Sequence, residues 1–495
     1  MNLSQQLLEN KAAAILEILQ LYSKVSVSKA AAMAGEEGTA VGASLEKYLE
    51  KYRTELLESV VPFWMRHAED AEHGGIFTCV SDQGAVVQGD KWLWSQFRAV
   101  WVFAKLYNSF TAPSMAAQRA EWLRFALAIY DFCVAHGWRE DAADGSGEPG
   151  WALCLSAAGE ELKGCESVYV DCFAIYGMAE LYRATRRADV GRWGRRSADA
   201  LLRRLRALNG ATPAPLGIPA FPYPIPAGQK VHGIPMMLAN TLWELGGALQ
   251  EPRYRDAALR CHEEIFEDFL APATTVATAT EAEAEGEGDG QQGGCAHKPC
   301  RHALMVERVR RDVAPGDGQP RGVPGPGGTA CVPGHVIEDM WFQIHIARER
   351  GGAAAEARVA QCAALMLSHL EAGWDEEHGG ILLGIDALGG EEVGWLFADT
   401  KLWWPHTEAL YGLLLAYEVT GDARFLAWHE KVHEWTYAHF PLAGTGEWVQ
   451  KLDRTGAPLT TTIALPVKDP FHLPRALIYC VEVLERLLAK QEAGV

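Results

Sequence analysis

Apolar residues are spaced along the chain in the pattern of α-helices rather than of strands. Six segments are apolar on most faces, which is typical of buried helices. Six others carry an apolar stripe on one side and charged residues on the other, as helices at a protein surface do. The first set covers about 90–108, 167–184, 234–249, 335–350, 403–419 and 472–488. The second set covers about 44–68, 115–136, 191–207, 255–270, 353–370 and 423–439.

The two kinds of helix alternate six times along the chain. This alternation predicts an all-α protein in which an inner ring of buried helices is enclosed by an outer ring. Few strands are expected, because no buried segment has the every-second-residue alternation of a strand. A short motif, His-Gly-Gly-Ile, occurs at 73–76 and again at 378–381, each time ahead of a buried, Trp-rich helix. Such self-similarity indicates a repeat-built fold, and we interpret His-Gly-Gly as a turn between an outer and an inner helix.

Two segments differ in composition from the helical part of the chain. Residues 1–40 include an Ala-, Ser- and Gly-rich stretch, where we expect a partly disordered N-terminal extension. A low-complexity insertion at about 272–330 contains too little apolar surface to offset the entropy of ordering. Leu304–Glu307 is the expected exception within it, a single ordered strand. The helical domain is therefore predicted to span 41–490, interrupted by this insertion.

Composition excludes several classes of function. The length of 495 residues fits one large repeat-built barrel or two domains, since single cores usually stop growing at about 250–300 residues. The net charge of −19 argues against binding nucleic-acid phosphates or anionic membranes. The sequence has neither an apolar run long enough to span a membrane nor a signal peptide. Its eleven cysteines are an odd, scattered set, which predicts reduced thiols and a cytoplasmic protein.

Two histidines at the expected starts of inner helices are candidates for proton transfer. Pro405 suits the first position of a helix, which places His406 in the first turn, where the helix dipole keeps an imidazole neutral. Pro333 and His335 repeat this arrangement. Glu338 follows on the same helical face, where its carboxylate can orient the imidazole of His335. We predict that both histidines project into the mouth of the barrel.

Further candidates lie in other inner helices. Arg98 falls within an otherwise apolar helix, where a charge is costly unless it is paired or faces a wet cavity. In a cavity it can hold an oxygen that becomes negative during a reaction. His472 and Arg475 stand at the start of the last inner helix. By contrast, the Cys/His cluster at 295–302 lies in the low-complexity insertion rather than on separate well-formed elements, so we predict no metal site.

Together these motifs resemble the N-acylglucosamine 2-epimerase family, also known as renin-binding protein. The resemblance covers about residues 45–490 and rests on the order and spacing of five stretches: 94–98, 233–240, 333–338, 401–408 and 471–475. It implies an (α/α)6 barrel with the active site at the mouth, where inner helices begin. It also implies catalytic roles for His335 and His406. Substrate contacts are implied for Arg98, Glu338, His472, Arg475, Asn240, Trp404 and Glu408.

The implied reaction inverts C2 of N-acyl-D-glucosamine to give N-acyl-D-mannosamine. One histidine removes the C2 proton, which the neighbouring aldehyde acidifies, and the other returns a proton to the opposite face. Arg98 stabilises the enolate oxygen. This chemistry needs no redox cofactor and no metal. Alternatives on the same barrel are a cellobiose-type 2-epimerase and an aldose–ketose isomerase. Cellobiose 2-epimerases carry an additional histidine motif on the third inner helix, where this chain has residues 235–240 without histidine.

Two alternatives come from other classes of protein. A glycoside hydrolase needs two facing carboxylates, whereas the distinctive helix starts here carry histidines. A non-catalytic binding protein is disfavoured by the intact set of candidate catalytic residues. The expected partner is a small-molecule sugar. The resemblance also implies a nucleotide effector and a homodimer, although no Walker-type phosphate loop occurs in the sequence.

Overall fold

The computed structural model describes residues 36–210, 217–270, 304–313, 323, 328–387, 393, 395–466 and 468–493. The extension expected at 1–40 lies almost entirely outside this set, as do the low-complexity part of the insertion and the Cys/His cluster at 295–302. The described residues belong to two compact units. One is drawn from Met1–Tyr52 and Val481–Val495, and the other, which holds all candidate site residues, from Arg53–Cys480.

The predicted helices are confirmed, with ends that agree to within a few residues for most of them. The inner helices are α4 (Leu93–Ser109), α6 (Val168–Thr185), α8 (Gly233–Leu249), α11 (Pro333–Arg350), α13 (Trp403–Thr420) and α15 (His472–Glu492). The outer helices are α2 (Glu36–Thr54) continued by η1 (Glu55–Val60) and α3 (Val61–His67), α5 (Ala116–His136) preceded by η2 (Pro113–Met115), α7 (Ala188–Leu208), α9 (Pro252–Glu264) continued by η3 (Ile265–Phe269), α12 (Ala353–Gly373) and α14 (Ala423–His439).

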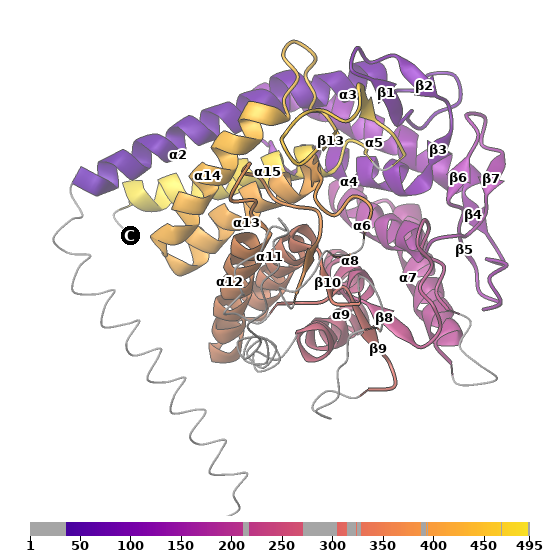
Figure 1. Cartoon of the computed structure of the whole chain (residues 1–495). Helices are drawn as coiled ribbons and strands as arrows, with labels where there is room; N and C mark the ends of the chain where they lie inside the picture. Colours follow the sequence, from indigo (N-terminus) through magenta and orange to yellow (C-terminus); the bar gives the residue numbers. More distant parts are fainter. Residues whose placement is uncertain are drawn as a thin grey trace, which may run out of the picture. The chain divides into compact units, whose positions relative to one another are not determined.

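Each inner helix packs against the next one in the chain. Contacts join α4 to α6, α6 to α8, α8 to α11 and α11 to α13, and Figure 1 shows α11 between α8 and α13. The start of α15 completes this series, because the ring of Tyr479 lies 5.7 Å from that of Trp101 in α4 and 4.8 Å from that of Tyr411 in α13. Helices α4, α6, α8, α11 and α13 also pack on the outer helices that follow them. The fold is the predicted (α/α)6 barrel.

The strands are short and occupy the connections between helices. They are β1 (Cys79–Ser81), β2 (Val86–Gln88), β3 (Lys91–Trp92), β4 (Trp138–Arg139), β5 (Gly150–Trp151), β6 (Cys154–Leu155), β7 (Glu161–Lys163), β8 (Gln229–Val231), β9 (Arg308–Arg310), β10 (Ala330–Cys331), β11 (Ile385–Asp386), β12 (Lys401–Leu402), β13 (Lys451–Leu452) and β14 (Thr462–Ala464). They form antiparallel pairs or three-stranded sheets.

The strand predicted at Leu304–Glu307 is displaced by a few residues. The strand is β9, which pairs with β8, and within 304–307 Met305 makes an isolated bridge to Leu270. The ladder continues one residue beyond β9, because the N–H of His232 donates to the carbonyl of Glu307 at 3.0 Å. Position 307 is therefore fixed next to the start of α8.

The two His-Gly-Gly motifs form the predicted turns. Isolated bridges close them, Glu69 with Ile76 and Trp374 with Ile381. The second glycine of each, Gly75 and Gly380, has φ of 73° and 80°, a left-handed conformation that favours glycine. Each turn leads from the end of an outer helix toward an inner one.

Two further observations bear on the cellular setting. Nine cysteines fall within the described residues, and all of them are free thiols. In the same part of the chain, no helix combines the length and apolar character that crossing a membrane requires.

Candidate active site

The first turns of three inner helices converge on one indole ring. The ring of His335, at the start of α11, stacks on Trp404 of α13 with centroids 5.0 Å apart, and the ring of His472, at the start of α15, lies 5.6 Å from the same indole. Gly334 permits this approach, because a Cβ there would lie 2.8 Å from Trp404 and from Pro405. Sequence reasoning predicted that helix starts meet, and this packing brings His335 and His472 together.

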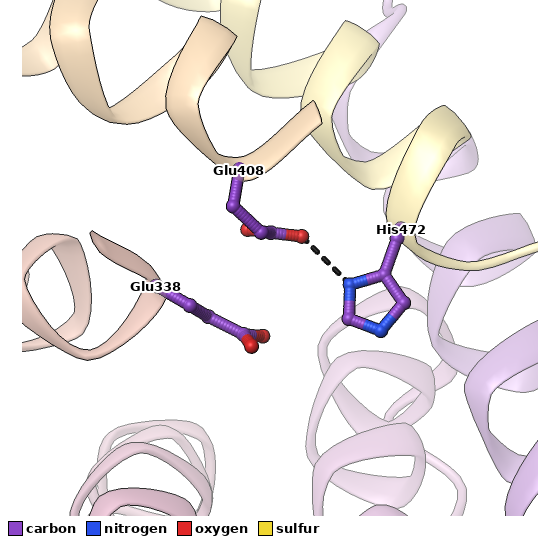
Figure 2. A group of neighbouring side chains, drawn as sticks. All are labelled: Glu338, Glu408 and His472. Atoms are coloured by element: carbon purple, nitrogen blue, oxygen red, sulfur yellow. Dashed lines mark hydrogen bonds and ion pairs between the residues drawn. The ribbon is translucent and has the colours of Figure 1, made fainter. Parts of the chain in front are cut away.

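His472 is held by a buried carboxylate. Its Nδ1 lies 2.7 Å from Oε1 of Glu408, so the imidazole N–H donates to Glu408, as Figure 2 shows. Nε2 has no hydrogen-bond partner within the described residues. Burial is the largest influence and lowers the pKa of His472 well below its ordinary value; Glu338 opposes this shift, while Arg475 and Arg98 add to it. The ring is neutral at neutral pH, and its Nε2 can accept a proton.

His335 is also held by a carboxylate at Nδ1, but its surroundings shift its pKa in the opposite direction. Its Nδ1 lies 3.0 Å from Oε1 of Glu307, and its side chain is 37% exposed. Nε2 has no hydrogen-bond partner among the described residues. Burial disfavours the charged imidazole, but the carboxylates of Glu307 and Glu338 outweigh it and raise the pKa of His335. His335 is therefore suited to hold a proton and donate it from Nε2.

Glu338 does not orient His335 as predicted. Its carboxylate accepts a hydrogen bond from the guanidinium of Arg475, which also donates to Glu408 at 2.7 Å. Arg475 is buried and lies over the ring of Phe471, 4.3 Å from its centroid. Glu338 is one turn from His335, but its hydrogen-bonding capacity is directed at the arginine.

Glu338, Glu408 and His472 form a group of three potential metal ligands within the described residues. Figure 2 shows their side chains pointing toward one another from α11, α13 and α15. The Arg475 guanidinium donates to both carboxylates of the group. Because this cation already engages an oxygen of each glutamate and offsets part of their charge, the arrangement is suited to an arginine-centred network rather than to a metal ion.

Arg98 is paired, and its partner was not predicted. Its Nη1 donates to Oδ2 of Asp469 at 2.9 Å, and Ser95 donates to the same oxygen at 2.9 Å. The guanidinium lies over the ring of Phe173, 4.0 Å from its centroid, and its side chain is 15% exposed. Since Arg98 also influences the pKa of His472 and Glu408, it lies within electrostatic range of the histidine site.

His406 is not available for proton transfer, which corrects the sequence prediction. Its Nδ1–H donates to the carbonyl of Leu402 at 2.7 Å, and its Nε2 accepts from the N–H of Ile381 at 2.9 Å. The ring is fully buried and stacks on Trp435, with centroids 4.9 Å apart. Burial lowers its pKa to about 3. The low pKa agrees with the predicted neutral imidazole. However, both ring nitrogens form hydrogen bonds with backbone groups, and the ring packs against the outer helix α14.

Asn240 stands apart from this cluster. It lies in α8, its side chain is buried, and its Nδ2 has no hydrogen-bond partner among the described residues. Within that part of the chain, no hydrogen bond or ion pair joins it to the two histidines. A substrate contact by Asn240 stays a prediction.

Sequence reasoning missed Glu307 and Asp469, the carboxylates that hold His335 and Arg98. Glu307 carried a signal, because it ends a short apolar run between two low-complexity stretches. Asp469 lies three residues before His472 and so just precedes the motif at 471–475. Their partners, however, are 28 and 371 positions away in sequence, and only the folded chain reveals such pairings.

Comparisons with known proteins agree with this architecture. A family model described as N-acylglucosamine 2-epimerase matches residues 325–476. The N-acylglucosamine 2-epimerase of Bos taurus is 31% identical over 438 residues, which cover 88% of this chain and 90% of that protein. The enzyme of the same name from Rattus norvegicus is 30% identical over 436 residues, covering 88% and 91%. The solved structure of a cellobiose 2-epimerase from Bacillus thermoamylovorans B4167 is similar with a TM-score of 0.66 at 16% identity, covering 89% of this chain and 100% of that one.

The last similarity shows the fold alone, an (α/α)6 barrel that a sugar epimerase also adopts. The similarity to the two mammalian proteins extends over most of both sequences. The chain belongs to the N-acylglucosamine 2-epimerase family, and the resemblance inferred from its motifs is confirmed.

Proposed function

We propose that the protein is a sugar 2-epimerase that interconverts N-acyl-D-glucosamine and N-acyl-D-mannosamine. One observation carries the proposal: His335 and His472 lie against the same indole, each has Nδ1 held by a glutamate, and each leaves Nε2 without a partner among the described residues. Two such imidazoles can act on opposite faces of one carbon. The names of the two mammalian relatives support an N-acylated hexosamine as the substrate.

The opposite pKa shifts of the two histidines suit them to complementary roles. Neutral His472 removes the C2 proton of the open-chain sugar, and the electron pair of the C2–H bond forms the enolate, with negative charge on O1. Protonated His335 then donates its Nε2 proton to the other face of C2. The pair ends the turnover with the proton on His472, which is the starting state for the reverse reaction. In this proposal His472 takes the role that the sequence motifs assigned to His406.

The surrounding charges support this division of work. Arg98 is partly exposed and lies within electrostatic range of His472, so we assign to it the enolate oxygen. Glu408 and Arg475 are buried: Glu408 holds His472 in place, and Arg475 in turn donates to Glu408, so we assign both to positioning rather than to contact with the sugar. Trp404, which touches both imidazole rings, offers a flat apolar face for the sugar chain.

The hydrogen bonds of Glu338 and Glu408 disfavour a glycoside hydrolase. That reaction needs a free acid and a nucleophile or base, whereas Glu338 and Glu408 both accept hydrogen bonds from Arg475. An aldose–ketose isomerase is harder to separate from an epimerase, because it forms the same enolate and differs in the carbon that receives the proton. Product analysis distinguishes the two.

The cellular setting and assembly are part of the proposal. We infer a cytoplasmic location, which the nine free thiols of the described residues fit. A homodimer and a response to nucleotides follow from the family resemblance. Light scattering of the purified protein tests the oligomeric state, and activity assays with and without ATP test the response to nucleotides.

The direct test is to incubate the purified protein separately with N-acetylglucosamine, N-acetylmannosamine, glucose, mannose and cellobiose, and to identify the products by NMR. We expect the two N-acetylhexosamines to interconvert and the other sugars to react more slowly. A ketose product would establish an isomerase instead. Turnover of cellobiose in preference to the N-acetylhexosamines would favour the cellobiose-type reaction, and no conversion of any sugar would leave a binding protein.

A further inference from the structure

A second buried histidine lies behind His335 and has no part in the mechanism above. His232 precedes the first residue of α8, and its side chain is 1% exposed. Its Nε2 lies 2.8 Å from Oδ2 of Asp339, a carboxylate that is itself fully buried. Its Nδ1 lies 3.9 Å from Oε1 of Glu307, the same oxygen that holds His335 at 3.0 Å. One carboxylate oxygen therefore stands between two imidazoles.

Regular structure fixes this arrangement. Strands β8 and β9 are paired up to Val231 and Arg308, and the next hydrogen bond joins the N–H of His232 to the carbonyl of Glu307. Asp339 lies one helical turn after His335 on α11, and its second oxygen accepts from the side-chain amide of Gln343 at 2.6 Å. Backbone pairing of the two strands thus places His232 beside Glu307, and helix α11 places Asp339 beside them.

The burial of Asp339 determines the charge on His232. A buried carboxylate is costly unless an opposite charge accompanies it. Burial disfavours a charged His232, but its hydrogen bond to Asp339 and the negative charge of Glu307, 3.9 Å from Nδ1, outweigh this effect and raise the pKa of His232 to about 10. These contacts favour the imidazolium form of His232 at neutral pH.

Among the described residues, two other titratable side chains near His232 and Glu307, those of His369 and Tyr169, do not supply this charge. Burial lowers the pKa of His369 to about 4 and raises that of Tyr169, so both are neutral at pH 7. Arg308 carries a positive charge beside Glu307 on the strand. Within the described residues, the titratable or charged groups that act on the cluster are Asp339, Glu307, His335, Glu338, His369, Tyr169 and Arg308.

We propose that His232 is a positioning residue for His335: as an imidazolium paired with Asp339, it shares the Glu307 carboxylate and so limits how tightly His335 holds its proton. This inference deepens the proposed function and rests on it for its catalytic meaning. Without His232, Glu307 would act on His335 alone and Asp339 would be uncompensated. His335 would then release its proton less readily.

The proposal predicts the sign of a change in the pH profile. The active form of the pair carries one proton, and activity falls on the alkaline side as His335 loses it. His232→Gln removes the positive charge but keeps a donor for Asp339, so it moves the alkaline limb of kcat/KM to higher pH. Glu307→Gln removes the negative charge beside His335 and moves the same limb to lower pH. Each shift should be roughly one pH unit, as for a single nearby charge.

His262→Gln is the matched control. His262 is also buried, and its Nδ1 lies 2.6 Å from the side-chain oxygen of Gln343, which contacts Asp339. Burial lowers the pKa of His262, so its replacement disturbs the same region without removing a charge. We expect its alkaline limb to stay where it is in the unmodified protein.

A second readout is independent of turnover. NMR titration of the full-length protein with labelled histidines reports the protonation of His335 and His232 directly. The His335 signal is assigned by His335→Asn, and the His232 signal by its through-space contact with Phe269, whose ring centroid lies 5.5 Å from that of His232. We expect His232 to stay protonated across the range in which His335 titrates. If His232→Gln does not fold, this titration still decides, and a His232 ring that is neutral at pH 7 overturns the proposal.

The remaining outcomes separate the two proposals. The role of His232 is rejected if His232→Gln leaves the alkaline limb of the kcat/KM profile in place. It is also rejected if His262→Gln moves that limb in the same direction and to the same extent. If His335 titrates at higher pH in His232→Gln while the unmodified protein converts no sugar, the coupling stands and the proposed epimerase activity falls.

Discussion

Two turn-and-helix units, 70–98 and 375–408, are built to one plan, and two of their differences bear on the site. In both, an aspartate, Asp70 or Asp375, accepts backbone N–H groups of the turn through one oxygen and a buried lysine, Lys91 or Lys401, through the other. The lysine begins a two-residue strand, and an inner helix follows it directly. The turn and its anchor are therefore a repeated structural device.

The first difference lies at corresponding positions 96 and 406. Gln96 accepts from the N–H of Ile76 at 2.8 Å and donates to its carbonyl, whereas His406 accepts from the N–H of Ile381 at 2.9 Å. A glutamine does in one unit what the histidine does in the other. The comparison teaches that a histidine in a distinctive motif can hold a turn rather than catalyse.

The second difference lies two residues further along each helix. Position 98 is an arginine paired with Asp469, and position 408 is a glutamate paired with His472 and Arg475. The repeat thus delivers opposite charges to the same region of the site. The two units therefore differ in charge at this inner-helix position but share the aspartate and lysine that anchor the turn.

The largest expected effect comes from His472, which has no counterpart in the turn device. His472→Asn keeps a donor for Glu408 but removes Nε2, so epimerisation should fall by about 10²–10⁴-fold, as for loss of a general acid or base. Steady-state kinetics with N-acetylmannosamine would measure this loss, and circular dichroism would verify folding. Turnover close to that of the unmodified protein would place His472 outside the chemistry.

The two buried lysines sharpen the comparison through stability. Lys91→Met leaves Asp70 with His73 as its remaining ionisable partner at 3.4 Å, whereas in Lys401→Met Arg454 still donates to Asp375 at 3.1 Å. Removing one partner of a buried pair costs about 3–5 kcal/mol, so Lys91→Met should lose roughly that much and Lys401→Met less. Urea unfolding of both variants measures the difference. Equal losses would show that Arg454 does not compensate.

The smallest effect on activity is expected at His406. Because Gln96 supports the equivalent turn, His406→Gln should keep turnover within a few fold of the unmodified protein. The stability of this variant should depend on pH less steeply than that of the unmodified protein. A buried neutral histidine whose pKa is lowered to about 3 stabilises the fold fully above its unfolded value of about 6.5, and that contribution is lost as pH falls.

The slope of this loss gives a measurable quantity. Below the unfolded value, His406 should cost the unmodified protein about 1.4 kcal/mol for each pH unit relative to His406→Gln. Unfolding free energies measured between pH 7 and 5 would test this. A variant that loses stability on acidification as steeply as the unmodified protein would show that His406 does not titrate on unfolding.

The sequence was sufficient to predict the ring of helices, the turns and the motifs that reach the site, because each depends on local periodicity or on nearby residues. It could not distinguish His406 from His472. Both stand in the first turn of an inner helix, and their difference depends on which partners the fold brings to each ring nitrogen: Leu402 and Ile381 for one, Glu408 for the other. Glu307 was missed for the same reason, since its value lies in a contact across the insertion.

The most direct test of the central claim, that His335 and His472 form the proton-transfer pair, is exchange at C2 in D2O. The unmodified protein should place deuterium at C2 of the product from the first turnover, because the returning proton comes from a different group. His335→Asn and His472→Asn should each stop inversion yet still exchange the C2 proton of one epimer, a different epimer in each variant, while His406→Gln should invert and exchange both. Product with unlabelled C2, or loss of all exchange in His406→Gln alongside continued inversion in His472→Asn, would contradict the account.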